Sequence, residues 1–183
     1  MVAIVKEKTE FIVEPGKQEI VIRRVFNASR ERVFKAITDR ELIPLWWGPR
    51  RFTTIVDKMD VRPGGLWRYI DRDASGTEYA VHGVYHDVVP FERVVYTSEL
   101  EWMPGKVGLE TTTLRDVDGK TEMTTKVVYQ SVEQRDGMAH GMEEGARETY
   151  QLLADLVEKG DEEFGEQSAG HPASRPLYPE DYE

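Results

Sequence analysis

The feature that most constrains the fold is one long amphipathic stretch, residues 133–159, which follows a series of short alternating segments. The side chains of one face recur at steps of three and four, as expected for an α-helix: Met138, Met142, Ala146, Thr149, Leu153 and Leu156. Charged residues such as Glu143 and Arg147 fall largely on the other faces. We therefore predict a long helix with one face covered by the rest of the chain.

A second row on this helix consists of glycines spaced by four, Gly137, Gly141 and Gly145. A glycine in a helix interior costs about 1 kcal/mol relative to alanine. Three of them in one half of a helix indicate that this half either approaches another backbone closely or borders empty volume.

The rest of the chain reads as one strand, two short helices and six further strands. The first strand is predicted at residues 19–26, with a shorter one at 10–14, and Ser29 is a suitable N-cap for the first helix. The sequence Thr38-Asp39-Arg40-Glu41 fits a capping box for a second short helix, which Pro44 keeps from being long. The later strands are predicted at residues 52–61, 66–72, 77–89, 93–102, 109–116 and 120–131. Runs of strands with segregated helices indicate an α+β fold with an antiparallel sheet.

Composition suits one globular domain with an extension at each end. We expect an N-terminal extension at residues 1–18, a domain at 19–159, and an acidic, proline-containing, flexible tail at 160–183. The tail holds seven acidic residues and one basic residue, so that most of the net charge of −10 lies there. An alternative is that Leu177, Tyr178 and Tyr182 dock on a partner or a second copy of the chain.

Several classes of protein are disfavoured by the same composition. The acidic balance argues against a nucleic-acid binder. The apolar runs are too short for membrane insertion, and no signal region is visible at the N-terminus. Because there is no cysteine, there is no disulfide framework and no thiolate nucleophile. We expect a cytoplasmic location.

Four short motifs, in this order, resemble one family. They are WWGP at residues 46–49, DVRPGG at 60–65, GVY at 83–85 and VVPFERVVYT at 88–97. Over about residues 18–158 the chain resembles the activator of heat-shock-protein-90 ATPase homologue family, within the START-like or SRPBCC superfamily.

The resemblance implies a helix-grip (Bet v 1-like) fold, in which a curved antiparallel sheet wraps around the long C-terminal helix and leaves a cavity between them. Relatives in this superfamily are described as binders of hydrophobic ligands, and a few as cyclases or hydrolases. In that arrangement the glycine row would form the roof of the cavity. The apolar residues near the C-terminal end of the helix would anchor the helix in the core: Leu152, Leu153, Leu156 and Val157.

Alternation along the strands sets one face of each toward this helix. The residues predicted to line a ligand pocket are Trp47, Trp67, Tyr69, Tyr96, Glu110, Thr112, Met123, Thr125, Met138, Gly141, Met142 and Gly145. The alternative is a fully packed core, with Met138 and Met142 filling irregular gaps. If Glu110 faces inward, its pKa should be raised and it could act as an acid or a base. A slip of one residue in register would instead place it in solvent.

No metal site, cofactor or catalytic constellation is expected. His82 and His86 have the spacing of a helical zinc pair, but they lie in a predicted strand, where residues four apart are about 13 Å apart. The chain also has no nucleophile elbow and no phosphate-binding glycine loop.

Three functional hypotheses follow from the sequence. The first is a domain that binds a small hydrophobic or amphipathic ligand. The second is a cyclase, dehydratase or hydrolase that uses the same cavity, with Glu110 and either Tyr69 or Tyr96. The third is a protein-interaction role, either chaperone-related or through the acidic tail.

Overall fold

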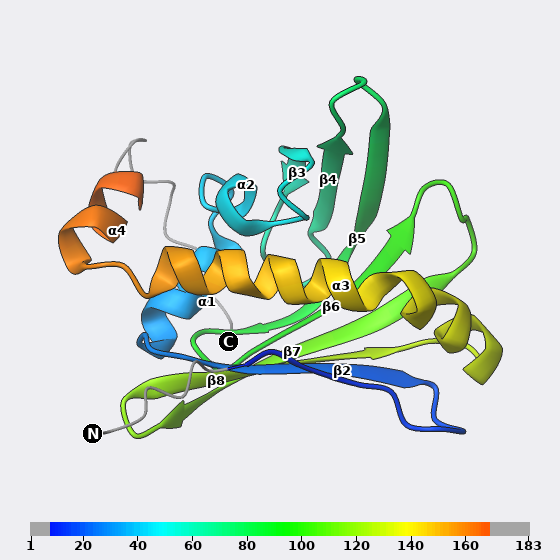
Figure 1. The fold of residues 1–183 in the computed structure, drawn as a ribbon, viewed down its shortest axis with the longest axis horizontal. Coiled ribbons are helices and arrows are strands. Elements are labelled where there is room, and N and C mark those ends of the chain that lie inside the picture. The colour runs from blue at the N-terminus through cyan, green and yellow to red at the C-terminus, as the bar shows by residue number, and fades with distance from the viewer. Residues whose placement is uncertain (1–7, 169–183) are drawn as a thin grey trace.

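The computed structural model describes residues 8–168, which form a curved antiparallel sheet and a long helix that crosses it (Figure 1). The strands are β1 (Glu10–Ile12), β2 (Glu19–Phe26), β3 (Thr53–Met59), β4 (Leu66–Arg72), β5 (Glu78–Val89), β6 (Arg93–Leu100), β7 (Val107–Val117) and β8 (Lys120–Val128). The helices in the described part are α1 (Arg30–Thr38), α2 (Ile43–Trp46), α3 (Val132–Val157) and α4 (Asp161–Ser168).

The eight strands form one sheet in the order β1-β2-β8-β7-β6-β5-β4-β3, and every neighbouring pair is antiparallel. From β3 to β8 each strand pairs with the next one along the chain. The helices α1 and α2 carry the chain from β2 to β3 at the opposite edge. Register shifts at Val56–Lys58 and Tyr85–Asp87 interrupt the pairing, and such bulges bend strands. The predicted α+β helix-grip fold is confirmed.

Several local predictions agree with the structure. The strands β2 and β4 have the predicted bounds, and Ser29 caps α1 by accepting a hydrogen bond from the Arg32 backbone N–H. The other strands and α3 differ from the prediction mainly at their ends, where the strand pattern passes into turn residues. The short strand expected at residues 10–14 is β1, which pairs with β2 at the edge of the sheet.

The predicted capping box at residues 38–41 is wrong. Thr38 is the last residue of α1, and its hydroxyl donates to the Phe34 carbonyl at 2.6 Å instead of capping the next helix. The N-cap of α2 is Leu42, which makes no side-chain capping bond. The backbone N–H groups of Leu42 and Ile43 instead donate to the Asp39 carbonyl, and the Asp39 side chain accepts from the Glu41 backbone N–H in a local turn.

The main core lies between the sheet, α1 and the C-terminal half of α3. Leu153 and Val157 of α3 are completely buried there, beside fully buried residues of α1 and β2 such as Val33 and Phe26. The Trp46 indole N–H donates to the Ala36 carbonyl at 2.9 Å, which ties α2 to α1. This packing holds one half of α3 against the sheet.

The helix α4 was not predicted, because its residues were assigned to the flexible tail. Phe164 of α4 is buried, and the Arg32 guanidinium lies 5.0 Å from the centre of its ring. Arg32 also donates to the Lys159 carbonyl at 2.8 Å and pairs with Asp161. The first part of the predicted tail is therefore attached to α1, while Leu177, Tyr178 and Tyr182 lie outside the described residues.

Candidate functional site: a cavity beneath the long helix

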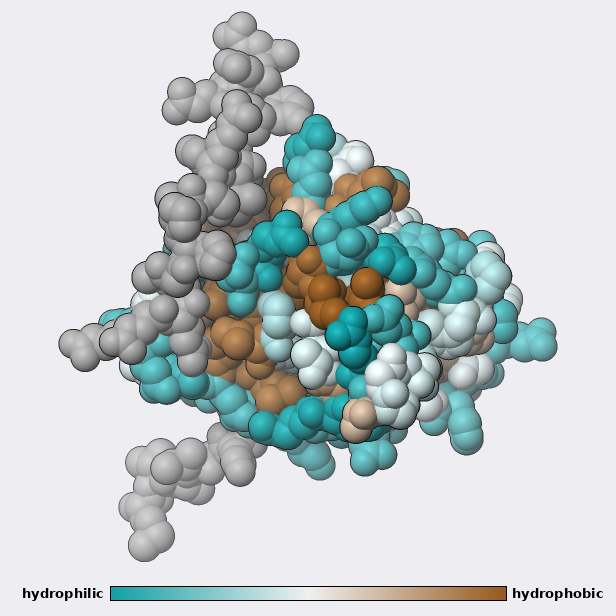
Figure 2. All heavy atoms as spheres, turned by 90° about the horizontal axis from the view of Figure 1, so that it is seen from above, coloured by the Kyte–Doolittle hydropathy of each residue, from teal (hydrophilic) through white to brown (hydrophobic). Residues whose placement is uncertain are grey.

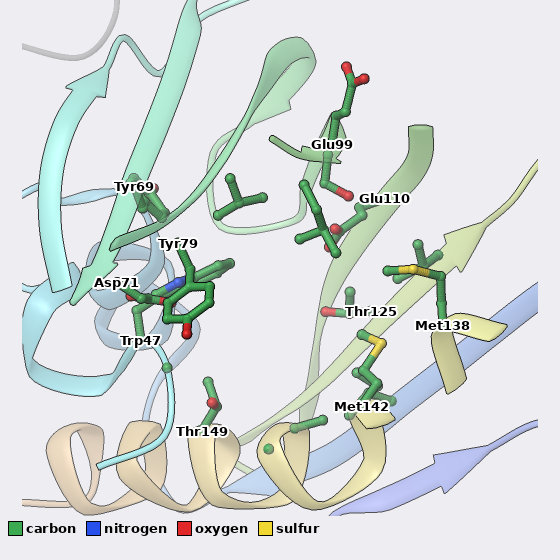
Figure 3. A pocket seen from close by; sticks show the side chains of 18 of the residues that line it. Trp47, Tyr69, Asp71, Tyr79, Glu99, Glu110, Thr125, Met138, Met142 and Thr149 are labelled. Carbon is green, nitrogen blue, oxygen red and sulfur yellow. The ribbon is translucent and has the colours of Figure 1, made fainter. Parts of the chain in front are cut away.

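A cavity of about 650 Å³ lies between the inner face of the sheet, the loop after α2 and the N-terminal half of α3. Its lining is mostly apolar and aromatic, with a few carboxyl and hydroxyl groups (Figure 3). The cavity reaches the surface beside Tyr79 and Trp102, which are 36% and 52% exposed. In the space-filling view of Figure 2, hydrophobic residues gather near the centre of the face and hydrophilic residues surround them.

Strand register decides which side chains enter the cavity. In the pairing of β6 with β7, Tyr96 lies opposite Glu110, and in the pairing of β7 with β8, Thr112 lies opposite Thr125. Directly opposed residues point to the same side of a sheet. Glu110 is therefore on the inner face, and all four side chains line the cavity.

The glycine row of α3 borders this space. A Cβ atom at Gly137 or Gly141 would have no other atom within 4 Å, whereas at Gly145 it would contact Pro49 at 3.5 Å. The first two glycines therefore leave open volume, and Gly145 is where α3 approaches the loop after α2. Of the two explanations offered by the sequence, empty volume applies to Gly137 and Gly141, whereas the contact at Gly145 is an ordinary one with a side chain and not a close approach of two backbones.

Aromatic rings form one wall of the cavity. The ring centres of Trp47 and Tyr69 lie 5.0 Å apart, those of Trp67 and Tyr69 4.9 Å, and those of Trp67 and Tyr96 5.7 Å. The Trp67 indole N–H donates to the Thr97 carbonyl at 3.0 Å. Gly83 lies directly beside this hydrogen bond. A Cβ atom at position 83 would lie only 1.7 Å from the Thr97 carbonyl oxygen. The wall therefore depends on a glycine at position 83.

Glu110 forms the centre of a polar group inside the cavity. Its carboxylate accepts a hydrogen bond from the Tyr96 hydroxyl at 2.9 Å and another from the Ser98 side chain. Burial raises the pKa of Glu110, and these two hydrogen bonds oppose the rise. Burial also raises the pKa values of Tyr96, Tyr129 and Tyr150, and the charge of Glu110 raises each of them further.

A chain of hydroxyl groups connects α3 to the sheet next to Glu110. The Tyr150 hydroxyl donates to Thr125 Oγ1 at 2.7 Å, and Thr125 shares a hydrogen bond of 2.9 Å with Thr112. Thr112 and Thr125 are buried, so their hydroxyl groups need such partners. These hydrogen bonds hold α3 at a fixed distance from the sheet at one end of the cavity.

Asp71 is a second carboxyl group on the cavity wall. It accepts from the Thr54 hydroxyl at 2.7 Å and from the Trp47 side chain. Burial raises the pKa of Asp71, and both hydrogen bonds act against this shift. Figure 3 shows Asp71 beside Trp47, apart from Glu110.

The structure places all twelve residues of the predicted pocket around this cavity. That they contact a ligand stays a prediction. The sequence analysis missed Asp71, Tyr85 and Tyr150, which line the cavity as well. Asp71 could have been found, since it continues the alternation of Trp67 and Tyr69 along β4. Tyr150 lies beside the predicted face of α3, and only the tertiary structure shows that its hydroxyl group reaches Thr125.

Neither a metal site nor a membrane span is found among residues 8–168. No group of three or more histidine, aspartate or glutamate side chains in this range could hold a metal ion. His82 and His86 lie on strand β5, as predicted, and His82 contacts Glu101 at 3.1 Å. No described helix is both long and apolar enough to cross a bilayer.

Comparison with known proteins identifies the family. Residues 27–158 match the family described as "Activator of Hsp90 ATPase homolog 1-like protein" (AHSA1). The chain belongs to this family. No curated protein sequence is significantly similar to it.

Solved structures of the family type share the fold. A protein from Chromobacterium violaceum is 27% identical, with a TM-score of 0.71 over 78% of this chain and 99% of its own. A protein from Rhodobacter sphaeroides is 25% identical, with a TM-score of 0.76 over 82% of this chain and 98% of its own. The AHSA1 protein from Silicibacter pomeroyi is 21% identical, with a TM-score of 0.64 over 75% and 95% of the two chains.

Proposed function

We propose that this AHSA1 family protein binds a small hydrophobic or amphipathic ligand in the cavity beneath α3. The observation that carries the proposal is the cavity itself, about 650 Å³ in volume and lined mainly by apolar and aromatic side chains. Pockets for small ligands typically have volumes of about 300–1,000 Å³ and such linings, with a few polar groups that orient the ligand. Glu110 and Asp71 are polar groups of this kind.

The elements around the cavity are held in place by contacts within the protein itself. Its floor is the hydrogen-bonded sheet, and its roof is a helix held at both ends. Arg135, which is 1% exposed, donates to the carbonyl groups of Glu14 and Glu19 near the start of α3. Leu153 and Val157 are packed in the main core at the other end. A preformed site avoids the entropic cost of ordering on binding.

Substitution of Gly141 tests this proposal. We expect Gly141→Leu to fill the space beneath α3, so that binding of the neutral dye N-phenylnaphthylamine weakens by about tenfold or more while the domain still folds. Dye fluorescence gives the affinity, thermal unfolding checks the fold, and native mass spectrometry of the purified wild type reveals any retained ligand. Gly160→Leu is the matched control, because Gly160 also has open space around it and lies outside the cavity.

Two results would count against the proposal. If the wild-type protein neither retains a ligand nor binds the dye, the cavity is not a binding site for apolar molecules. If Gly141→Leu folds and binds the dye as tightly as the wild type, the glycine row does not border the binding space.

A second candidate is an enzyme of the cyclase, dehydratase or hydrolase type that uses the same cavity. The observation in its favour is the 2.9 Å hydrogen bond between Tyr96 and Glu110, which brings two titratable groups together inside an apolar site. A carboxyl group with a raised pKa is suited to proton transfer near neutral pH. Unchanged turnover of every accepted substrate by Glu110→Gln would exclude this assignment.

A further inference from the structure

We propose that the ligand of this cavity carries a basic amine and that Glu110 pairs with its ammonium group. This inference rests on the proposed function, because it needs a ligand in the cavity. It adds the chemical class of that ligand. Its starting point is that, within residues 8–168, no positively charged side chain pairs with Glu110.

The polar groups that interact with Glu110 are hydroxyl groups. Tyr96 and Ser98 come from β6, Tyr129 follows β8, and Tyr150 comes from α3. None of these carries a positive charge. Within residues 8–168, no lysine or arginine forms an ion pair with Glu110, whereas surface carboxylates such as Asp60, Glu78 and Asp87 pair with arginines.

The two cations on the cavity lining lie elsewhere. Lys106 is exposed in the loop before β7, and the guanidinium of Arg51 lies over the ring of Phe52, 4.8 Å from its centre. Both belong to loops at the border of the cavity. An incoming ligand therefore meets positive charge at the border and an unpaired carboxyl group inside.

Glu110 is only partly exposed, at the cavity surface, and a carboxylate withdrawn from water is costly unless it is paired or fully hydrogen-bonded. Tyr96 and Ser98 supply two donors, while an ionised carboxylate can accept about four hydrogen bonds. An ammonium group supplies both the missing charge and further donors. A ligand carboxylate or phosphate would instead add a second negative charge next to the first, which is unfavourable at short range.

The surroundings of Glu110 also suit a cation. Tyr96 and Trp67 lie next to one another with ring centres 5.7 Å apart, and aromatic faces attract ammonium groups. Asp71 is a further carboxyl group on the lining, so the interior carries acidic groups in two places. The apolar remainder of the cavity would hold the hydrocarbon body of the amine.

A series of probes with one apolar body and three head groups tests the inference. We expect phenylbutylamine to bind the full-length wild-type protein about tenfold more tightly than phenylbutanol, since a hydrogen-bonded charge pair is worth about that ratio. Phenylbutyric acid should bind more weakly than the alcohol. Isothermal titration calorimetry at neutral pH measures all three affinities.

The outcomes separate this inference from the proposed function. If the alcohol binds and the amine shows no advantage, the inference is overturned and the proposed function stands. If the dye binds and none of the three probes does, the inference is overturned and the proposed function stands; if the dye does not bind either, the proposed function fails with it. Tighter binding of the acid would also overturn the inference, because it would show that the cavity selects anions.

Substitution of the carboxyl group locates the pairing. We expect Glu110→Gln to reduce the affinity for the amine about tenfold and to change that for the alcohol less than about twofold. Glu122→Gln is a matched control, since Glu122 is paired with Arg115 outside the cavity. If Asp71→Asn removes the preference for the amine and Glu110→Gln does not, the assignment to Glu110 is wrong.

The pH dependence gives a readout that a purely structural role would not produce. An ammonium group pairs with Glu110 only when this carboxyl is ionised, and burial raises its pKa. The preference for the amine over the alcohol should therefore be lost as the pH falls through the raised pKa of Glu110. Asp71 also lines the cavity and has a pKa raised by burial, so the comparison needs both variants. Glu110→Gln should remove this pH dependence and Asp71→Asn should keep it, and the reverse result would overturn the inference.

Discussion

The two halves of α3 belong to one continuous amphipathic helix but meet very different surroundings. In the C-terminal half, Leu153, Ala154 and Val157 are almost completely buried in the main core. In the N-terminal half, Met138 and Met142 are only partly buried, and Gly141 has open space around it. The same helical periodicity therefore produces close packing at one end and a cavity roof at the other, because glycine replaces larger side chains in the first half.

The roof half packs less closely than the other half, and polar groups attach it at its two ends. Arg135 near its start is buried and donates to the carbonyl groups of Glu14 and Glu19. Tyr150, where the roof meets the packed half, donates to Thr125. Attachment at two points allows the helix between them to span the cavity without filling it.

The larger loss of stability along α3 is expected in its packed C-terminal half. Leu153→Ala should lower the free energy of unfolding by about 3 kcal/mol, since it removes a fully buried side chain and leaves a void. Met142→Ala in the roof half should cost only about 1 kcal/mol, because Met142 already borders empty space. Urea unfolding of both variants measures the difference. Equal losses would show that the two halves are packed alike.

A smaller effect is expected at the polar attachment of the roof. Arg135→Met should cost about 2 kcal/mol, because it removes the charged donor of two hydrogen bonds from a buried position. Arg115→Met is the control, since the Arg115 side chain is 75% exposed and should contribute less than about 0.5 kcal/mol. A loss below that limit in Arg135→Met would mean that the roof is held by other contacts. The measurement is again urea unfolding.

The smallest expected effect has the opposite sign. Gly141→Ala should raise the free energy of unfolding by about 0.5–1 kcal/mol, because alanine favours the helix and its Cβ meets no other atom. Gly83→Ala should instead destabilise the protein strongly, since its Cβ would lie 1.7 Å from the Thr97 carbonyl oxygen. Thermal unfolding of the two variants compares a glycine that leaves space with one required by close approach. Destabilisation by Gly141→Ala would contradict the open roof.

Much of the fold could be predicted from periodicity and turn residues. The alternation in β2 and β4 specified their bounds, and the segregation of strands and helices indicated the antiparallel sheet. Alternation also limited Glu110 to two orientations, toward the helix or toward solvent, and the pairing of Tyr96 with Glu110 places both on the inner face. Local prediction failed at Thr38, where two local interactions compete. Its hydroxyl can cap the following helix or donate to a carbonyl group of its own helix, and it does the second.

The sequence by itself determined the order of the elements, the inner face of each strand and the glycine row of α3, because these depend on residue type and spacing along one segment. Only the tertiary structure decided that Gly145 approaches Pro49 while Gly141 borders open space. It also decided that the polar partners of Glu110 in the described part of the chain are hydroxyl groups and not a cation. Such contacts join residues far apart in the chain. Their distances follow from how α3 lies across the sheet, which no single segment encodes.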